Sequence, residues 1–345
     1  MIKNSSIIIF LFTLILGTLI SISSNSWLGC WIGLEINLLS FIPLIVKFNN
    51  LISTEASLKY FLTQAFASSL LLFSIIIFIM SYNFTFQFNL FNNFNISFII
   101  FITLLIKSGT APFHFWFPNV IEGINWTNNL ILITWQKIAP IIIISYFLFN
   151  NFFIFFILAS VLIGSLGGLN QTSIRKIIAF SSINHLGWML AAIIFNEYIW
   201  LFYFIIYFFL SFILILIFNI FKIFYLNQIF SLFIHSYILK FIFLISLLSL
   251  GGLPPFLGFL PKWLVIQSLI NLNQYYIVIF IICISLVTLY FYLRICYTAF
   301  LLNYEELNWS YKLYFNNNLF NLISFFLIIS IFGLILFLSL VYIIN

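Results

Sequence analysis

Four ionisable side chains, Glu35, Lys107, Lys137 and Lys262, lie deep inside long apolar stretches of the sequence. Glu35 lies about 10 residues from the start of its apolar stretch, Lys107 about 12 and Lys137 about 11. At about 1.5 Å per helical residue, they lie about 15–18 Å from a helix end, near the middle of a hydrocarbon core about 30 Å thick. Lys262 lies at comparable depth. An isolated charge there costs about 2.5 kcal/mol or more, so each side chain needs a partner, water or a neutral state.

These residue types at this depth indicate proton transfer. A lysine buried in an apolar medium can lose and regain a proton near neutral pH, and a nearby carboxylate favours its charged form. Glu35 is the expected partner of Lys107, and a pair whose separation changes acts as a proton switch. A row of such lysines joined by water would conduct protons across the membrane. The alternative, in which each lysine belongs to a static buried ion pair, also fits the sequence.

Two histidines are candidate proton relays between the lysines. His114 occurs in Pro-Phe-His-Phe-Trp and His185 in Ser-Ser-Ile-Asn-His-Leu-Gly. A histidine pKa of about 6.5 suits proton transfer at physiological pH, and a hydrogen-bonded packing role is the alternative for both. Three scattered histidines do not form a metal-site pattern. The cysteines, Cys30, Cys283 and Cys296, contain no C-x-x-C pair and are expected to be small buried hydrophobic residues.

The elements that carry these side chains are predicted to be transmembrane helices. Hydrophobic residue types make up 65% of the 345 residues and charged types only 5%, whereas soluble domains carry about 25% charged residues. Apolar runs of about 20 residues recur along the chain, which predicts an all-α, polytopic membrane protein of about eleven transmembrane helices. The predicted spans are residues 5–23, 25–46, 58–81, 95–121, 126–149, 152–169, 173–196, 198–223, 238–271, 275–302 and 320–344.

Two of these helices are predicted to be broken at membrane depth. The fourth span contains Lys-Ser-Gly-Thr-Ala-Pro, which ends at Pro112, and the ninth contains Gly251, Gly252, Pro254 and Pro255. Glycine and proline interrupt the backbone hydrogen bonds of a helix. Such breaks are tolerated in a membrane only where the freed backbone groups face protein or water.

The two breaks occupy matching places, which predicts an internal repeat. Each lies in the fourth span of a five-span unit, and Pro112 and Pro255 are 143 residues apart. An odd number of spans per unit would invert the second unit relative to the first. We predict one membrane domain, 1–345, composed of a first repeat (1–150), a second repeat (151–303), and a loop with the last helix (304–345). The alternative is that the prolines are unrelated, because transmembrane helices commonly contain proline.

Basic residues lie on one side of this arrangement. If the chain crosses the membrane at each span, the loops opposite the N-terminus carry Glu197 and no lysine or arginine. The basic loops are expected on the cytoplasmic or matrix side. The absence of an Arg-rich presequence and the abundance of Phe, with 49 residues, fit synthesis inside an organelle with an AT-rich genome or in a bacterium. In a mitochondrion, the N-terminus would face the matrix and the C-terminus the intermembrane space.

Several long motifs, taken in order, resemble the subunit 2 family of proton-pumping NADH:ubiquinone oxidoreductase (respiratory complex I), in its insect form. The resemblance covers essentially residues 1–345. Its motifs are Trp-Leu-Gly-Cys-Trp-Ile-Gly-Leu-Glu ending at Glu35, Lys-Ser-Gly-Thr-Ala-Pro-Phe-His-Phe-Trp-Phe-Pro from Lys107, Thr-Trp-Gln-Lys-Ile-Ala-Pro around Lys137, Gly-Gly-Leu-Asn-Gln-Thr-Ser-Ile-Arg-Lys ending at Lys176, Ser-Ser-Ile-Asn-His-Leu-Gly-Trp-Met around His185, and Leu-Gly-Gly-Leu-Pro-Pro-Phe-Leu-Gly-Phe-Leu-Pro-Lys-Trp around Lys262.

The resemblance implies a role for each deep ionisable residue. The family belongs to the antiporter-like subunits, which are related to Mrp-type cation/proton antiporters. Its bacterial members have fourteen helices and its animal mitochondrial members lack the first three, which agrees with eleven spans. Within the family a glutamate and three lysines carry proton transfer, and they correspond to Glu35, Lys107, Lys137 and Lys262 in this sequence.

The resemblance also implies that this chain holds no cofactor of its own. NAD, FMN, the iron–sulfur clusters and ubiquinone would be bound by other subunits. The expected partners are a neighbouring antiporter-like subunit, the small quinone-side membrane subunits, and lipids such as cardiolipin, in the mitochondrial inner membrane. The net charge of +6 is not a nucleic-acid footprint. Two other functions fit the sequence, namely a separate transporter that exchanges protons for sodium, and a structural subunit whose lysines form static ion pairs.

Overall fold

The computed structural model describes residues 5–47, 50–81, 94–147, 150–233, 237–297, 324–325 and 327–334. Helices dominate this part of the chain, where the β-type pairing is an isolated bridge between Ser173 and Tyr225. Seven of the described helices are long and apolar enough to cross a membrane by length and composition, and shorter apolar helices accompany them. The all-α, polytopic fold is confirmed, while the number of eleven spans stays a prediction.

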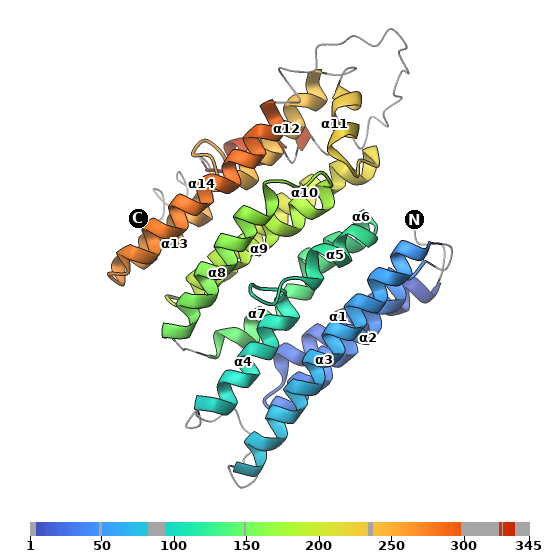
Figure 1. Cartoon of the computed structure of the whole chain (residues 1–345), viewed down its shortest axis with the longest axis vertical. Coiled ribbons are helices and arrows are strands. Elements are labelled where there is room, and N and C mark those ends of the chain that lie inside the picture. The colour runs from blue at the N-terminus through green and yellow to red at the C-terminus, as the bar shows by residue number, and fades with distance from the viewer. Residues whose placement is uncertain are drawn as a thin grey trace. The chain divides into compact units, whose positions relative to one another are not determined.

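The chain divides into two compact units, Met1–Phe149 and Asn150–Asn345. Their relation as inverted repeats stays a prediction, as does the side of the membrane on which each terminus lies. The helices of unit 1 are α1 (Ser5–Ser23), α2 (Trp27–Ile45), α3 (Leu51–Ser81), α4 (Phe94–Ser108), α5 (Trp116–Gly123), α6 (Trp126–Ile133) and α7 (Trp135–Ser145) (Figure 1).

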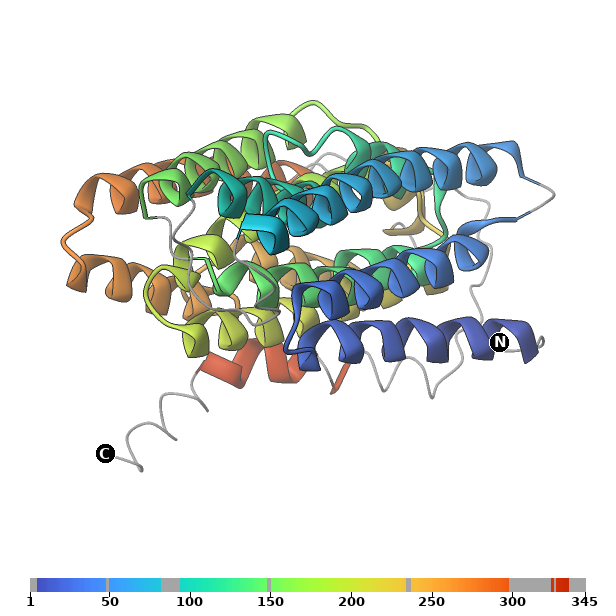
Figure 2. The same ribbon diagram turned by 90° about the horizontal axis from the view of Figure 1, so that it is seen from below.

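Small residues allow the first two helices of unit 1 to approach closely. A Cβ atom on Gly17 would lie 3.0 Å from the carbonyl oxygen of Gly33, and one on Gly33 would lie 2.5 Å from the backbone nitrogen of Ser21. Figure 2 shows α1 and α2 side by side along their length. Helices in a membrane associate through such close packing, because lipid supplies no hydrophobic driving force between them. The second helix of this pair, α2, carries Glu35.

The predicted break in the fourth span lies between α4 and α5. Gly109 has φ +75°, and its N–H and that of Thr110 donate to the carbonyls of Ile106 and Leu105. This is a Schellman motif, which satisfies the last carbonyls of a helix and requires a left-handed residue, usually glycine. Residues 109–115 then leave the helical path, with Pro112 among them, before α5 begins at Trp116. The helix therefore ends at Ser108, one residue after Lys107.

Unit 2 contains seven helices in its described part up to residue 297. They are α8 (Asn150–Gly168), α9 (Ile174–Ile193), α10 (Glu197–Phe221), α11 (Leu226–Phe233), α12 (Tyr237–Gly251), α13 (Phe259–Asn271) and α14 (Tyr275–Tyr297) (Figure 1). Helix α9 is buried along almost its whole length and packs against α8, α10 and α13. It therefore forms the core of the unit and carries His185.

The second predicted break lies between α12 and α13 and ends the helix in the same way as the first. Gly252 has φ +80°, and its N–H and that of Leu253 donate to the carbonyls of Ser249 and Leu248. Gly251 is the last residue of α12 and Pro254 and Pro255 lie in the connection. The Leu257 N–H at the end of this connection donates to the carbonyl of Ser330. Protein groups thus satisfy several of the backbone groups that the break exposes.

Three features of the helices differ from the sequence prediction: where α3 begins, the division of one predicted span, and one additional helix. Helix α3 begins at Leu51 rather than at residue 58. The side-chain oxygen of Asn50 accepts a hydrogen bond from the Ile52 N–H, so the helix already begins in the polar turn that precedes the apolar run. The predicted span 126–149 is divided at Thr134 into α6 and α7. The short helix α11 was not predicted. Of the predicted span 320–344, only residues 324–325 and 327–334 are described, and His235, Lys312 and the loop at 304–319 lie outside the described residues.

Candidate functional site

Lys107 lies in the last turn of α4, beside the break. Its side chain is 7% exposed, and its carbonyl accepts a hydrogen bond from Nε2 of Gln64 on α3 at 3.3 Å. The C-terminal end of a helix carries partial negative charge, which favours a cation there. The Nζ atom of Lys107 is buried without a hydrogen-bond partner among the residues that the structure describes. A buried donor of this kind needs an acceptor, and water is the usual one.

Lys137 lies in the first turn of α7 and is 1% exposed. Its Nζ atom lies 4.8 Å from the centroid of the Phe117 ring, which α5 supplies from just after the break. An ammonium group over an aromatic face gains about 0.5–2 kcal/mol. The first broken helix therefore positions both lysines, with Lys107 before the break and the ring that holds Lys137 after it.

Lys107 and Lys137 line the same buried cavity of unit 1. The cavity has a volume of about 20 Å³, and a space of about 10–15 Å³ by this measure is enough for one water molecule. Its lining combines the two lysines with polar groups and an apolar rim. The lining residues are Leu34, Asn37, Leu38, Tyr60, Gln64, Lys107, Ser108, Trp116, Phe117, Leu132, Gln136, Lys137 and Pro140.

Glu35 is half-buried on α2, at the edge of this site. Its carboxylate acts electrostatically on both Lys107 and Tyr60. Its Oε2 atom is buried and has no hydrogen-bond partner within the described part of the chain. Glu35 thus lies within electrostatic reach of Lys107, without a direct hydrogen bond between the two.

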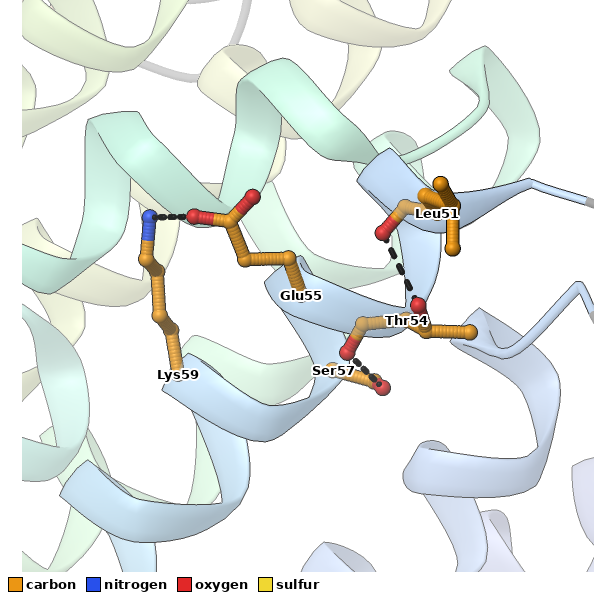
Figure 3. A network of polar contacts seen from close by, with 5 residues as sticks. All are labelled: Leu51, Thr54, Glu55, Ser57 and Lys59. Atoms are coloured by element: carbon orange, nitrogen blue, oxygen red, sulfur yellow. Dashed lines mark hydrogen bonds and ion pairs between the residues drawn. The ribbon is translucent and has the colours of Figure 1, made fainter.

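The ion pair between Glu55 and Lys59 shows how a surface pair differs from this arrangement. Lys59 Nζ lies 2.6 Å from Oε1 of Glu55, one helical turn earlier on α3, and the side chains are 47% and 66% exposed (Figure 3). The hydroxyls of Thr54 and Ser57 donate to the carbonyls of Leu51 and Thr54, three residues earlier on the same helix. All these contacts are local to one helix, so they stabilise the start of α3 and do not belong to the buried site.

His114 lies within the first break, but the structure does not place it on the cavity shared by the lysines. Its Nδ1 atom lies 3.2 Å from the carbonyl oxygen of Pro112, and its ring centroid lies 4.3 Å from that of Phe115. The histidine is therefore held against the backbone of the break. Glu122 lies in the last turn of α5.

In unit 2, Lys262 bridges the second break. It lies in the first turn of α13, is 6% exposed, and its Nζ atom donates to the carbonyl of Gly251 at 2.8 Å. Its ammonium also lies 5.7 Å from the centroid of a Trp188 ring. The lysine thus contacts the C-terminal end of α12, where the helix dipole favours positive charge. In unit 1, Lys107 is part of the last turn of α4. In unit 2, Lys262 belongs to α13, and its ammonium reaches the last turn of α12.

His185 lies on α9 and contacts two tyrosines of α10. Its Nδ1 atom lies 2.9 Å from the hydroxyl oxygen of Tyr203, and its ring centroid lies 4.9 Å from that of Tyr207. All three side chains are buried. The sequence did not single out these tyrosines, because nothing local distinguishes them among the 17 tyrosines of an aromatic-rich chain.

Two further polar side chains of unit 1, Asn37 and Gln136, were also not predicted from the sequence as site residues. Nε2 of Gln136 donates to Oδ1 of Asn37 at 2.9 Å, and both residues line the cavity. Their positions carried a weak signal, since Gln136 precedes Lys137 and Asn37 follows Glu35 by two residues. Gln64 also lines the cavity, whereas the hydroxyls of Thr63 and Ser69 donate to carbonyls of their own helix.

Comparisons with protein families cover almost the whole chain. Residues 24–288 match the family described as NADH:quinone oxidoreductase/Mrp antiporter, TM, and residues 289–341 match NADH dehydrogenase subunit 2 C-terminus. NADH-ubiquinone oxidoreductase chain 2 of Anopheles gambiae is 58% identical over 343 residues and covers 99% of both chains. The chain 2 of Bos taurus is 41% identical over 307 residues and covers 87% of both.

Solved structures share the fold at lower identity. A chain of respiratory complex I from Thermus thermophilus superposes with a TM-score of 0.83 at 22% identity, and the match covers 96% of this chain and 79% of that one. A chain of the Mrp complex from a Dietzia species gives a TM-score of 0.74 at 18% identity, and the match covers 84% of this chain and 59% of that one. Broken helices with lysines at their ends therefore lie in a fold shared with both kinds of complex.

Proposed function

Since this chain belongs to the NADH-ubiquinone oxidoreductase chain 2 family, we propose that it is a membrane-arm subunit of respiratory complex I that conducts protons across the mitochondrial inner membrane. Electron transfer from NADH to ubiquinone takes place in other subunits and supplies the energy. The proton-transfer groups of this chain are Glu35, Lys107, Lys137 and Lys262. The single observation that carries the proposal is the cavity that Lys107 and Lys137 share.

The cavity gives a proton a short buried path within unit 1. Lys107 on α4 and Lys137 on α7 come from different helices, and both line a space large enough for about one water molecule. A lysine ammonium donates protons and the neutral amine accepts them, so a water between two lysines can hand a proton from one to the other. Polar groups of Gln64 and Gln136 line the same space and orient that water.

Glu35 controls how readily Lys107 holds its proton. Its carboxylate acts on Lys107 electrostatically from α2, without a hydrogen bond between them. An approach of the carboxylate would stabilise the ammonium, and a withdrawal would favour release of the proton toward the cavity. A conformational change driven by electron transfer elsewhere in the complex would therefore load and unload Lys107 by moving Glu35 relative to it.

Lys262 and His185 perform the corresponding step in unit 2. The Lys262 ammonium bonds to the Gly251 carbonyl at the end of α12, and the long lysine stem allows it to turn away once the proton is lost. His185, on the buried helix α9, supplies a second group that can both donate and accept a proton. His114 is a weaker candidate, because it lies on the backbone of the first break and not on the cavity.

The geometry favours proton conduction over static ion pairs. A static pair would satisfy the buried Lys107 ammonium with the Glu35 carboxylate, yet Lys107 Nζ and Glu35 Oε2 each lack a hydrogen-bond partner within the described residues. Buried groups left in this state destabilise a fold unless water or a function accounts for them. Exchange of protons with water in the cavity is such a function.

The partners of the chain follow from its place in the complex. We propose contacts with a neighbouring antiporter-like subunit and with the small quinone-side membrane subunits, and binding of NAD, FMN, iron–sulfur clusters and ubiquinone by other subunits. A second cavity, of about 720 Å³ in unit 2, fits the headgroup of an anionic lipid such as cardiolipin. It is lined by residues 168–172 and 225–227 and by Arg294 near the end of α14, whose guanidinium suits a phosphate group.

A Lys107→Met variant of the full chain, assembled in complex I in sealed inner-membrane vesicles, tests the proposal. Methionine keeps the length of the side chain and removes the titratable amine. We expect the complex to assemble, as judged by native electrophoresis, and its NADH-driven proton pumping to fall about tenfold or more, which corresponds to about 1.4 kcal/mol or more. Lys59→Met, at the exposed lysine of α3, is the matched control and should pump normally.

Normal pumping and normal NADH oxidation in Lys107→Met would overturn the proposal. The sodium-exchange alternative is tested in the same vesicles. Proton movement that requires sodium and persists without NADH would show a separate transporter, whereas movement that requires NADH and is independent of sodium supports the proposal.

A further inference from the structure

We propose that Tyr203, Tyr207 and Tyr292, three buried tyrosines of unit 2, form a hydroxyl relay that carries protons between His185 and Lys262. The inference rests on the proposed function and adds to it a set of residues that act on the proton path of unit 2. The sequence motifs around His185 and Lys262 do not include these tyrosines, which α10 and α14 supply.

The relay begins at His185. Its Nδ1 atom lies 2.9 Å from the hydroxyl oxygen of Tyr203. Tyr203 is 1% exposed, so it has little access to bulk solvent and its hydroxyl is a direct neighbour for the histidine proton. Tyr207 lies one helical turn further along α10, and its ring centroid lies 4.9 Å from that of His185. The histidine therefore contacts two tyrosines at once.

The three tyrosines are electrostatically coupled to one another. Tyr203 interacts electrostatically with Tyr207 and Tyr292, and Tyr207 with Tyr292. The hydroxyl of Tyr207 faces the side chain of Ser182, and that of Tyr292 faces Ser181. Both serines lie on α9 within one turn of His185 and are buried. Buried polar groups gathered in this way cost stability unless they bond to one another or serve a function.

The far end of the cluster lies beside the group that holds Lys262. The Tyr292 ring flanks Gly251, since a Cβ atom on this glycine would lie 3.4 Å from Cδ2 of Tyr292. The carbonyl of the same glycine accepts the hydrogen bond from Lys262 Nζ at 2.8 Å. The relay requires that a turn of the flexible lysine stem, or water, connect the Tyr292 hydroxyl with the lysine amine.

Each transfer in the relay conserves charge and atoms. Protonated His185 gives its Nδ1 proton to the oxygen of Tyr203, while Tyr203 gives its own hydroxyl proton to the next acceptor. A tyrosine hydroxyl is both a donor and an acceptor, so it is neutral before and after the step. The sequence repeats through Tyr207 and Tyr292 and ends when the neutral amine of Lys262 accepts the proton. The reverse order carries a proton from Lys262 to His185.

Tyrosine-to-phenylalanine variants of the full chain in complex I test the relay, because they remove one oxygen and keep the ring. The variants are Tyr203→Phe and Tyr292→Phe. Their matched controls are Tyr198→Phe and Tyr290→Phe, which change exposed tyrosines on the same two helices. Native electrophoresis and NADH oxidation with an artificial electron acceptor establish that each complex is assembled.

We expect Tyr203→Phe and Tyr292→Phe to lower the number of protons pumped per NADH by about tenfold, and the controls to pump normally. In the two relay variants the rate in D2O should also fall further than in the wild type, because the remaining path includes slower proton transfers. A purely structural role would lower assembly without changing the ratio of protons to NADH or the solvent isotope effect.

The outcome separates this inference from the proposed function. If Tyr203→Phe and Tyr292→Phe pump normally while Lys262→Met and Lys107→Met do not, the relay is wrong and the lysine path stands. If the lysine variants also pump normally, both are wrong.

Discussion

Lys107, at the end of α4, and Lys137, at the start of α7, line one buried cavity of about 20 Å³ although 30 residues and a broken helix separate them in the chain. The break explains this relationship. It ends α4 just after Lys107 and begins α5 at Trp116, so that Phe117 lies both on the cavity and under the Lys137 ammonium. A continuous helix through residues 109–115 would keep these groups on one regular surface. The break therefore builds the site.

Replacement of Glu35 by glutamine should impair proton pumping while the complex still assembles. The change removes the negative charge that acts on Lys107 and keeps the size of the side chain. Lys107 then loses the group that controls its proton, so we expect pumping per NADH to fall about tenfold. Proton uptake and NADH oxidation by sealed vesicles measure the effect.

Glu55→Gln provides the comparison for this carboxylate. It removes an exposed charge from α3 and breaks the pair with Lys59. Exposed pairs contribute little to stability, and neither residue of this pair lines the cavity, so we expect normal pumping. An equal loss in Glu35→Gln and Glu55→Gln would show a general effect of charge rather than a role for Glu35.

Loss of the hydrogen bond between Gln136 and Asn37 should destabilise the first unit around the cavity. Gln136→Leu leaves the buried carboxamide of Asn37 without its donor. An unsatisfied buried group costs about 1–3 kcal/mol. We expect the thermal inactivation temperature of the assembled complex to fall in Gln136→Leu and in Asn37→Leu.

The double variant decides whether this loss comes from the bond. Once both polar groups are replaced, no unsatisfied partner remains. The fall in inactivation temperature of the double variant should therefore be smaller than the sum of the falls in the two single variants. Strict additivity in the thermal inactivation of the single and double variants would show that the two side chains act independently.

Gly252→Ala should be more damaging than Gly251→Ala, although the residues are adjacent. Gly252 has φ +80°, and a Cβ atom there would lie 3.0 Å from Lys262 Nζ. A left-handed conformation costs an alanine about 1–2 kcal/mol, and the contact also displaces the ammonium. A Cβ atom on Gly251 meets its nearest neighbour at 3.4 Å, which is ordinary contact.

We expect Gly252→Ala to lower both the thermal stability of the complex and its pumping, and Gly251→Ala to change stability little. Thermal inactivation and proton uptake of the two assembled complexes provide the measurement. Equal behaviour of the two variants would show that neither the backbone conformation nor the position of Lys262 at this break matters.

The sequence predicted the helices and their breaks because those signals are local. Glycine next to proline inside an apolar run marks a break wherever the chain folds, and the structure ends α4 and α12 within three residues of the predicted motifs. The depth of the lysines in the membrane was inferred from helical rise alone and stays a prediction. Local signals were weaker at Thr134, where nothing adjacent to it in the chain indicated a division between α6 and α7.

Contacts between distant residues could not be predicted in the same way. The bond between Gln136 and Asn37 joins residues 99 positions apart, and the contact of His185 with Tyr203 joins two buried helices. Such contacts depend on how helices rotate and pack, which apolar periodicity does not determine in helices that are hydrophobic on all sides. For the same reason the contact of His114 with the carbonyl of Pro112 could not be predicted, and its role as a proton relay stays a prediction.

The most direct test of the account is a map of the native assembly at a resolution that shows ordered water. We predict water in the cavity of unit 1 that lies within hydrogen-bonding distance of the Lys107 ammonium and is connected through hydrogen bonds to the side chain of Lys137. A dry cavity, or Lys107 and Lys137 each bonded directly to a carboxylate with no water between them, would contradict proton transfer through these lysines.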